Sequence, residues 1–270
     1  MADNMHPDTA TQAAALLWQH RRAGSKLAAL PAGLRPADAT AGHAIQAQLP
    51  AVAGDAVVGW KIAATSTAGQ AHIGVGGPLA GRLLAATVAP DGASFSLTGN
   101  GMRVAEPEFV FRFGTDLPPR SQPYALHAVL DAVAALHTGI EVPDSRFADF
   151  VTAGEAQLLA DDACAHQFVL GPAATADWRA LDLPRHAVHA RIHNAGAQRL
   201  VRSGSGAAVL GDPRLALAWL VNDLCQRGLG LRAGQFVTTG TCMPPLAIAP
   251  GDRVVADFGV LGQVSAAFTA

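Results

Sequence analysis

Two glutamates separated by one residue are the feature of this sequence best suited to chemistry. Glu106 and Glu108 lie in the segment Arg103–Phe113, where phenylalanines at 109, 111 and 113 alternate with other residues. Such alternation is typical of a β-strand, and it places both glutamates on the face opposite the aromatic rings. Two carboxylates held close together repel each other. A divalent cation with oxygen ligands is the usual way to relieve that repulsion.

A third carboxylate is expected to complete such a site. Glu141 is the best candidate, because it lies in the short apolar segment Gly139–Val142, which follows a helix-like run. Three carboxylates on neighbouring strands would leave positions open for water and substrate, an arrangement that suits Mg²⁺ or Mn²⁺. The pattern Glu-x-Glu alone is more often a solvated strand face. Only 15% of the residues are charged, however, and this scarcity favours the metal-site interpretation.

A lysine within an apolar strand is the next candidate. Lys61 lies in the segment Gly59–Ala63, where an ammonium group would be costly to bury without a carboxylate or a bound anion. A structural ion pair explains it as well as a functional role does on burial alone. Beside a metal–carboxylate site, this lysine could hold a substrate carboxylate or transfer protons.

The segment Thr238–Thr241 ends an expected strand and presents hydroxyls and backbone N–H groups that can bind a carboxylate or an oxyanion. An ordinary hydroxyl-rich strand end is the alternative. No site role is expected for the histidines, because one group fits a solvated strand face, and two isolated histidines could border a cleft but are usually structural. The group is His186, His189 and His193, and the isolated residues are His72 and His166.

The elements expected to position these residues are mainly short strands. They are 57–63, 83–88, 93–97, 106–113, 139–142, 167–170, 187–193, 235–239, 253–258 and 263–268. Helices are expected at 10–23, 36–48, 126–136, 152–160 and 213–227. The strands do not alternate regularly with helices, so the predicted fold is α+β with a mixed, barrel-like sheet and peripheral helices. Residues 1–55 are expected to form a helical N-terminal cap on a catalytic domain of residues 56–270.

The composition of the chain limits the kinds of partner that it is expected to bind. The formal charge of the 270 residues is −2 and there is no basic block, which argues against nucleic acid and favours a small-molecule ligand. No apolar run reaches the roughly 20 residues needed to cross a bilayer, so no membrane partner is expected. Cys164, Cys225 and Cys242 are too few and too widely spaced for a disulfide framework or a zinc site, and a cytoplasmic location is expected.

With these residues assembled, the chain resembles the hydratase/decarboxylase branch of the fumarylacetoacetate hydrolase superfamily, the group of 2-keto-4-pentenoate hydratase and 4-oxalocrotonate decarboxylase. The order and spacing of several segments together carry the resemblance. They are Val58–Ile62, Ile73–Val75, Glu106–Phe109, Ala134–His137, Ile140–Arg146, Gly206–Gly211, Leu217–Leu220, Gly251–Asp252 and Leu261–Ser265.

The resemblance implies a mixed β-roll core and a divalent ion, Mg²⁺ or Mn²⁺, held by Glu106, Glu108 and Glu141. A 2-oxo acid would chelate the ion through its carboxylate and 2-oxo oxygen, which favours an enolate when a proton, carbon dioxide or an acyl fragment leaves. Lys61 matches the lysine of the family's G-[YW]-K-I segment and would transfer protons or bind substrate. Thr241 matches the last residue of the T-G-[ST] turn, a substrate contact. Members of the group commonly assemble from dimers, so a homo-oligomer is expected.

The leading expectation is a lyase that hydrates a 2-hydroxy-2,4-dienoate to a 4-hydroxy-2-oxo acid in aromatic catabolism. Leu79 stands where many hydratases carry an acid, which leaves a decarboxylase of 4-oxalocrotonate-type acids as the alternative. The family's A-D-N-A run appears as Ala160–Ala163 with Asp162 in place of the amide, a change that could alter the charge of the pocket. A non-catalytic subunit or binding protein of the same fold is the third possibility.

Overall fold

The computed structural model describes residues 5–270 of the chain. Its α-helices are α1 (Pro7–Ala23), α2 (Ala39–Ala53), α3 (Thr67–Ile73), α4 (Leu126–Asp131), α5 (Glu155–Ala160) and α6 (Pro213–Gln226). Its strands are β1 (Val57–Ala63), β2 (Leu79–Leu84), β3 (Val88–Pro90), β4 (Ser94–Ser96), β5 (Val104–Phe113), β6 (Val133–Val142), β7 (Gln167–Ala173), β8 (Ala187–Asn194), β9 (Ala197–Ser205), β10 (Phe236–Thr241), β11 (Leu246–Ala247), β12 (Asp252–Asp257) and β13 (Gln263–Thr269).

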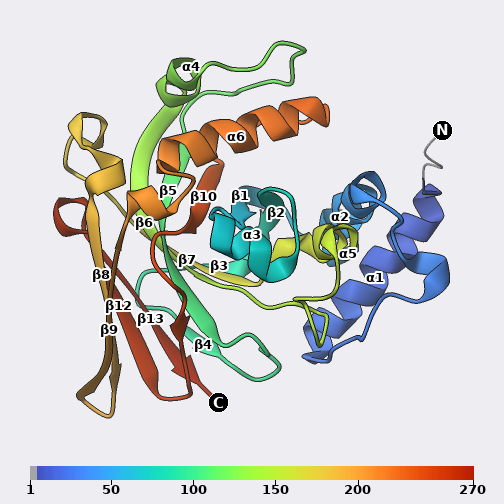
Figure 1. Cartoon of the computed structure of the whole chain (residues 1–270), viewed down its shortest axis with the longest axis horizontal. Coiled ribbons are helices and arrows are strands. Elements are labelled where there is room, and N and C mark those ends of the chain that lie inside the picture. The colour runs from blue at the N-terminus through green and yellow to red at the C-terminus, as the bar shows by residue number, and fades with distance from the viewer. Residues whose placement is uncertain (1–4) are drawn as a thin grey trace.

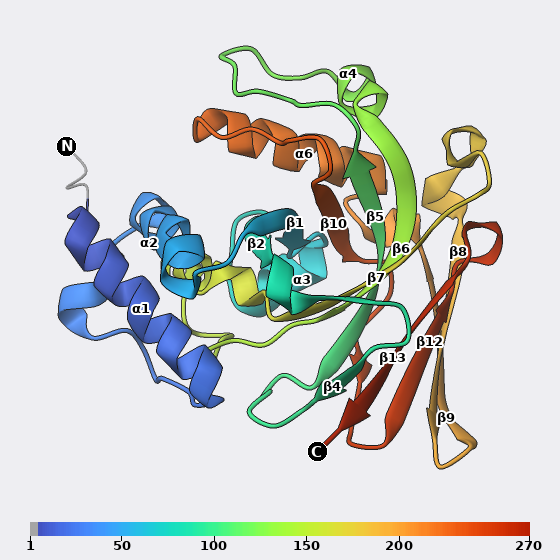
Figure 2. The same ribbon diagram turned by 180° about the vertical axis from the view of Figure 1, so that it is seen from behind.

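Two mixed sheets form the body of the molecule (Figures 1 and 2). The larger sheet has the order β2-β1-β10-β5-β6-β7-β3, with β11 paired to β5, and the smaller sheet has the order β4-β13-β12-β8-β9. Parallel pairs such as β1 with β10 occur beside antiparallel pairs such as β5 with β6. The sheets curl around a shared core, and the predicted α+β class with a barrel-like sheet is confirmed.

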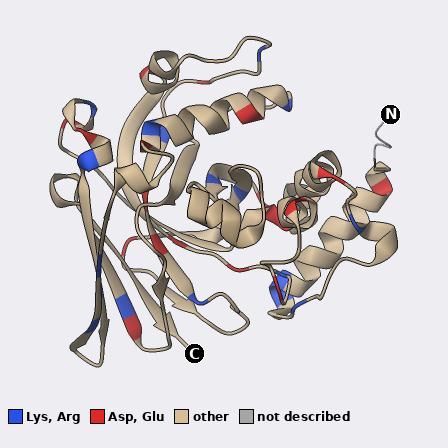
Figure 3. Cartoon of the chain, viewed as in Figure 1, with Lys and Arg blue, Asp and Glu red and all other residues tan. Residues whose placement is uncertain are grey.

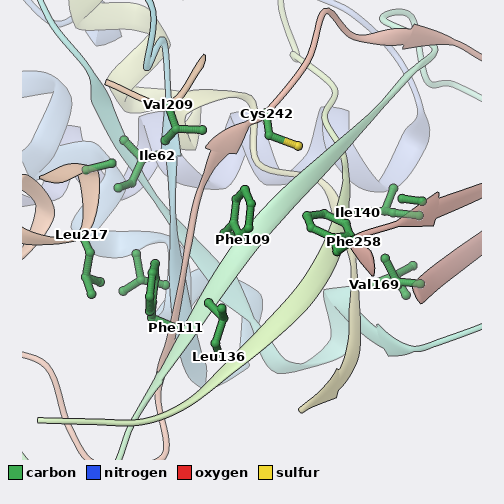
Figure 4. Close-up of a cluster of buried hydrophobic side chains, with 14 of the residues drawn as sticks. Ile62, Phe109, Phe111, Leu136, Ile140, Val169, Val209, Leu217, Cys242 and Phe258 are labelled. Carbon is green, nitrogen blue, oxygen red and sulfur yellow. The ribbon is translucent and has the colours of Figure 1, made fainter. Parts of the chain in front are cut away.

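The main core lies between the strands of the larger sheet, helix α6 and the second sheet (Figure 4). Phe109 and Phe111 point into it from β5, as the alternation in the sequence predicts. The ring of Phe109 packs edge-on against Phe258, with the centroids 5.2 Å apart. Burial of these rings holds β5 in register, because a shift of one residue would turn the phenylalanines away from the core.

Helices α1 and α2 pack together beside the larger sheet, and their apolar side chains form a separate cluster that includes Phe147 and Ala160. The Arg21 side chain, near the end of α1, donates hydrogen bonds to the carbonyls of Ala165, at 2.7 Å, and His166. These bonds attach the first helix to the segment that leads into β7. Among residues 5–270, no helix combines the length and the apolar character needed to cross a membrane.

Several predicted boundaries are wrong. The helix expected at 126–136 ends at Asp131, because Val133–Val142 pairs along its length with β5 and buries Leu136. These long-range contacts outweigh the helix propensity of the alanine-rich run. The strand expected at 83–88 is instead the end of β2, a 3₁₀ turn at Ala85–Thr87 and the start of β3. Helix α2 begins after its N-cap Asp38 and not at Pro36.

Strand β9 and helix α3 are among the elements that were not expected from the sequence. Strand β9 is an edge strand with no fully buried residue, and helix α3 likewise has no fully buried residue. Neither element therefore carries the periodic apolar pattern by which a strand or a helix is recognised. Helix α3 nevertheless has clear ends, because the Ser66 side chain caps its first turn and Gly74 closes it in the left-handed conformation.

Candidate active site

The four charged residues expected at the site lie on three strands of the larger sheet. Lys61 is on β1, Glu106 and Glu108 are on β5, and Glu141 is on β6. Strand β10 lies between β1 and β5, and β5 pairs directly with β6. In that pairing Glu106 is the register partner of Glu141. Figure 3 shows how few charged positions the molecule has, with acidic ones among the central strands.

The three glutamates can offer one oxygen each within 4.8 Å of one another. Glu108 and Glu141 are fully buried, and Glu106 is partly exposed. One oxygen of Glu108, Oε2, accepts hydrogen bonds from the Thr238 hydroxyl and, at 2.7 Å, from the backbone N–H of Gly240. Within the described part of the chain, Oε1 of Glu108 and Oε2 of Glu141 have no hydrogen-bond partner. Buried carboxylate oxygens without a partner are costly, so this cluster requires a cation or protons.

Burial raises the pKa of each of the three carboxyl groups, and repulsion between them adds to the shift at Glu106 and Glu108. Burial, together with repulsion from Glu141, raises the pKa of Glu106 to about 7. Burial and repulsion from both neighbours raise the pKa of Glu108 well above its ordinary value, although Thr238 and Lys61 act in the opposite direction. Burial also raises the pKa of Glu141 against the attraction of Lys61. These shifts are those expected of acidic groups that are assembled for a positive ligand.

Lys61 provides one positive charge to the cluster. Its Nζ lies 3.0 Å from Oε1 of Glu141 and donates a hydrogen bond of 2.9 Å to the carbonyl of Ala163. Burial alone would lower the pKa of Lys61, but the attraction of Glu141 and the other glutamates raises it above its ordinary value. The lysine is therefore a charged ammonium group that is aimed at the carboxylates.

The turn at the end of β10, the strand between β1 and β5, also supports the cluster. Gly240 has φ of +98°, and a Cβ at this position would come within 2.1 Å of the Thr65 hydroxyl oxygen. Only glycine fits here, and this conformation lets its N–H reach Glu108. The Thr241 hydroxyl donates a 2.7 Å hydrogen bond to the carbonyl of Met243, and Thr241 lines the adjacent cavity.

A cavity of about 580 Å³ opens beside the carboxylates. Lys61, Glu106, Gly240 and Thr241 line it, and most of its other lining residues are apolar. Leu79 is buried in this lining, so the position that the family resemblance associates with an acid is apolar here. This volume is typical of a site for a small organic ligand.

The structure also places residues that the sequence did not assign to the site. His72 was excluded from the expected site but lines the cavity, since it belongs to the unexpected helix α3. Thr238 binds Glu108 directly, and its place in the Thr238–Thr241 run was the available signal. The other histidines of the sequence analysis, His166 and the group at 186, 189 and 193, are not among the lining residues.

The substitution at Asp162 acts outside the cavity lining. Its Oδ1 accepts a 2.7 Å hydrogen bond from the backbone N–H of Arg82, and burial raises its pKa to about 7. The neighbouring Ala163 carbonyl accepts the hydrogen bond from Lys61. Asp162 is therefore not a lining residue but positions the segment that holds the lysine, and its effect on the charge of the pocket stays a prediction.

The donor set fits a divalent metal ion. Three carboxylates from two paired strands converge, two of their buried oxygens have no partner among the described residues, and one of the three, Glu106, borders the cavity. Hard cations such as Mg²⁺ prefer carboxylate oxygens and keep some positions for water or substrate. The roles of the three glutamates as ligands, and of Lys61 and Thr241 toward a substrate, stay predictions.

Comparisons of the chain with family models, curated proteins and solved structures point to the same family. The model of the fumarylacetoacetate (FAA) hydrolase C-terminal family matches residues 43–269. A 2-keto-4-pentenoate hydratase of Burkholderia vietnamiensis is 33% identical over 259 residues, which cover 95% of this chain and 96% of that protein. A 4-oxalocrotonate decarboxylase of Pseudomonas sp. strain CF600 is 31% identical over 217 residues, which cover 80% of this chain and 78% of that protein.

A solved structure extends the comparison to the fold. The 4-oxalocrotonate decarboxylase of Pseudomonas putida G7, complexed with magnesium and adipate, superposes with a TM-score of 0.85 at 25% identity. The alignment covers 98% of this chain and 99% of that one. The similarity therefore includes the helices at the N-terminus as well as the sheets.

Proposed function

Since this chain belongs to the fumarylacetoacetate hydrolase family, we propose that it is a Mg²⁺- or Mn²⁺-dependent lyase that hydrates a 2-hydroxy-2,4-dienoate to a 4-hydroxy-2-oxo acid. The near full-length similarity to 2-keto-4-pentenoate hydratase supports the reaction type. The observation that carries the proposal is the convergence of Glu106, Glu108 and Glu141 beside a cavity that Lys61 also lines.

Glu106, Glu108 and Glu141 would hold the metal ion. When bound, such an ion supplies positive charge that draws electron density from the 2-oxo oxygen of a 2-oxo acid. The magnesium and calcium complexes of the structurally similar decarboxylase support a divalent ion of this kind.

In the hydration, the dienoate loses its 2-hydroxyl proton and gains a proton at C5, and water then adds its hydroxyl to C4 and a proton to C3. Lys61 is suited to the first stage, because its charged Nζ lies at the cavity and can attract the 2-oxygen or exchange a proton with it. Thr241 would contact the substrate from the end of the neighbouring strand β10. The apolar lining keeps bulk water from competing for these groups.

A decarboxylase of 4-oxalocrotonate-type acids is the second candidate. One specific observation favours it, which is that Leu79 lines the cavity where the family resemblance associates many hydratases with an acid. The similarity to 4-oxalocrotonate decarboxylase in sequence and in fold is consistent with it. Both reactions would use the same carboxylates and the same lysine.

Turnover assays separate the two reactions. We expect Mg²⁺-dependent loss of the ultraviolet absorbance of 2-hydroxypenta-2,4-dienoate, with formation of the 4-hydroxy-2-oxo acid followed by NMR. A Glu106→Gln variant should be inactive at the same Mg²⁺ concentration. Release of carbon dioxide from 4-oxalocrotonate without hydration of the dienoate would reject the hydratase in favour of the decarboxylase. Absence of both reactions would support the non-catalytic alternative.

The remaining features of the proposal concern the whole protein. We assign residues 1–55 to a helical cap and residues 56–270 to the catalytic domain, and we place the reaction in aromatic catabolism. A homo-oligomer built from dimers and a cytoplasmic location complete the proposal. All three cysteines are free thiols in the described chain, which agrees with a reducing compartment.

A further inference from the structure

We propose that the cavity selects a substrate with one carboxylate and an apolar group at its other end, and that it discriminates against a second carboxylate there. The inference rests on the proposed function, because it takes the first carboxylate and the 2-oxo group to lie at the end formed by Lys61 and Glu106. Beyond the proposed function, the inference specifies the chemical nature of the end of the substrate that does not react.

The charge of the lining is the first argument. Among the described residues that line the cavity, Lys61 is the only lysine or arginine. Its ammonium group lies at the carboxylate end of the cavity, 3.0 Å from Glu141 and bonded to the carbonyl of Ala163, and serves the reacting end of the substrate. A second substrate carboxylate would lose its hydration in the cavity and would find no cationic side chain of its own, which is unfavourable.

The apolar wall is the second argument. Leu79 and Leu158 belong to a hydrophobic cluster, and the partly buried Ile73, Met102 and Phe150 pack against that cluster. All five also line the cavity. Partly exposed apolar side chains that face a cavity gain when an apolar ligand covers them, because water is released from both surfaces.

The size of the cavity is the third argument. A volume of about 580 Å³ corresponds to roughly nineteen water molecules at about 30 Å³ each. A dienoic acid of five carbons would fill only part of this space. The unfilled part is available to an alkyl or aryl substituent on the end remote from the carboxylate.

His72 is the main alternative partner for a second carboxylate. It lines the cavity on the exposed side of α3, and its ring packs edge-on against Phe150 at a centroid distance of 6.0 Å. His72 therefore lies against the apolar wall, and its contribution to binding a second carboxylate is tested directly by the His72→Leu variant. The Ser66 hydroxyl, which accepts a hydrogen bond from the N–H of Gly69, carries no charge that could balance a second carboxylate.

A matched series of 2-oxo acids tests the inference. Binding of 2-oxobutanoate, 2-oxooctanoate and 2-oxosuberate would be measured by calorimetry on the full chain with Mg²⁺. The last two have equal length and differ in a methyl or a carboxylate at the remote end. We expect 2-oxooctanoate to bind at least tenfold more tightly than either 2-oxobutanoate or 2-oxosuberate. A parallel series of substituted 2-hydroxydienoates should show the same order in kcat/KM.

Substitution at Met102 provides a gain-of-function test. Met102→Lys places a cation on the apolar wall and should reverse the preference toward 2-oxosuberate by at least tenfold. The matched control Met102→Leu keeps the wall apolar and should preserve the order of the wild type. Thermal unfolding of both variants checks that they are folded, and the wild-type series remains decisive if Met102→Lys does not fold.

The possible failures are distinguishable. Equal or tighter binding of 2-oxosuberate would overturn the inference while leaving the proposed function intact. Binding of 2-oxosuberate that disappears in His72→Leu would overturn it too, and would assign the second carboxylate to that histidine. If none of the 2-oxo acids binds in the presence of Mg²⁺ or Mn²⁺, the proposed function itself fails.

Discussion

At the scale of single residues, the clustered glutamates are held by different partners. Glu108 is fixed by Thr238 and Gly240, Glu141 lies beside Lys61, and Glu106 borders the cavity. Each glutamate therefore offers at least one oxygen that the protein itself does not satisfy or does not fully enclose. Crowding of these carboxyl groups lowers the stability of the protein without a bound cation and concentrates negative charge at one place.

Replacing Glu108 by glutamine should stabilise the metal-free protein. The amide oxygen can still accept the hydrogen bonds from Thr238 and Gly240, while one of the mutually repelling carboxyl groups is removed. We expect the free energy of unfolding in EDTA at about pH 8 to rise by about 1–2 kcal/mol. Urea denaturation with and without Mg²⁺ measures this, and stabilisation by Mg²⁺ should be largely lost.

Asp131→Asn is the control for Glu108→Gln, because Asp131 is an exposed carboxylate at the end of α4. This variant should change neither the free energy of unfolding in EDTA nor the stabilisation by Mg²⁺ by more than about 0.5 kcal/mol. A Glu108→Gln variant that is less stable than wild type in EDTA, and that Mg²⁺ still stabilises as strongly as wild type, would contradict the metal-site interpretation.

Replacing Lys61 by methionine should have the opposite effect on stability. The change leaves Glu141 buried without its cation, and breaking a buried pair in this way costs about 3–5 kcal/mol. Part of this loss should be recovered on adding Mg²⁺, because the metal ion replaces the missing positive charge. Turnover should fall by roughly 10²-fold or more, as expected for loss of a group that transfers protons.

Lys26→Met is the matched comparison for Lys61→Met. Lys26 pairs with Asp144 but is partly exposed, so its loss should cost only about 1 kcal/mol and should not depend on Mg²⁺. Equal losses in the two variants, both insensitive to the metal, would mean that Lys61 has a structural role alone.

At the scale of elements, the attachment of the first helix to the sheet depends on the segment before β7. Arg21 in α1 donates to the carbonyls of Ala165 and His166, and Arg146 also donates to the carbonyl of Ala165. The His166 imidazole lies in this positively charged environment. Burial, with repulsion from Arg21, Arg146 and Lys26, lowers its pKa to about 2.

This shift predicts a loss of stability on acidification. His166 stays neutral in the folded state while the unfolded chain binds a proton below about pH 6.5, so stability falls as the pH decreases below that value. At pH 5 the contribution should be about 2 kcal/mol. His166→Gln should reduce the loss between pH 7 and pH 5 by that amount in urea denaturation. The exposed His127→Gln should leave the profile unchanged, and identical profiles for His166→Gln and wild type would refute the assignment.

At the scale of the whole molecule, the proposed metal binding would be linked to folding. The three glutamates of the proposed site come from β5 and β6, so they converge only when the central sheet is formed. A free Mg²⁺ concentration of 100 times Kd should therefore stabilise the fold by about 2.7 kcal/mol. This corresponds to an increase in Tm of roughly 5–10 °C. The measurement is a Mg²⁺ titration of EDTA-treated protein followed by scanning calorimetry.

Sodium chloride at matched ionic strength is the control for the calorimetric titration, because screening alone also relieves repulsion between charges. The increase in Tm should continue with the logarithm of the Mg²⁺ concentration above Kd, as linkage requires. An increase no larger than that given by sodium chloride would argue against a specific ion site.

Local patterns in the sequence determined several features of this protein. The alternation of phenylalanines identified β5 and placed Glu106 and Glu108 opposite Phe109 and Phe111, because the period of a strand is fixed by its own backbone. The apolar surroundings of Lys61 predicted a buried ammonium group that needs a carboxylate, and Glu141 is that carboxylate. The α+β class followed from the same kind of pattern.

Only the tertiary structure decided the rest. The register that sets Glu106 opposite Glu141, and the insertion of β10 between β1 and β5, depend on pairing between segments far apart in the chain. The cavity wall is likewise assembled from separate segments, including α3, whose residues have no buried periodic face to reveal it. Local sequence fixes the direction of a side chain along its own strand, whereas its neighbours on other strands are chosen by packing of the whole chain.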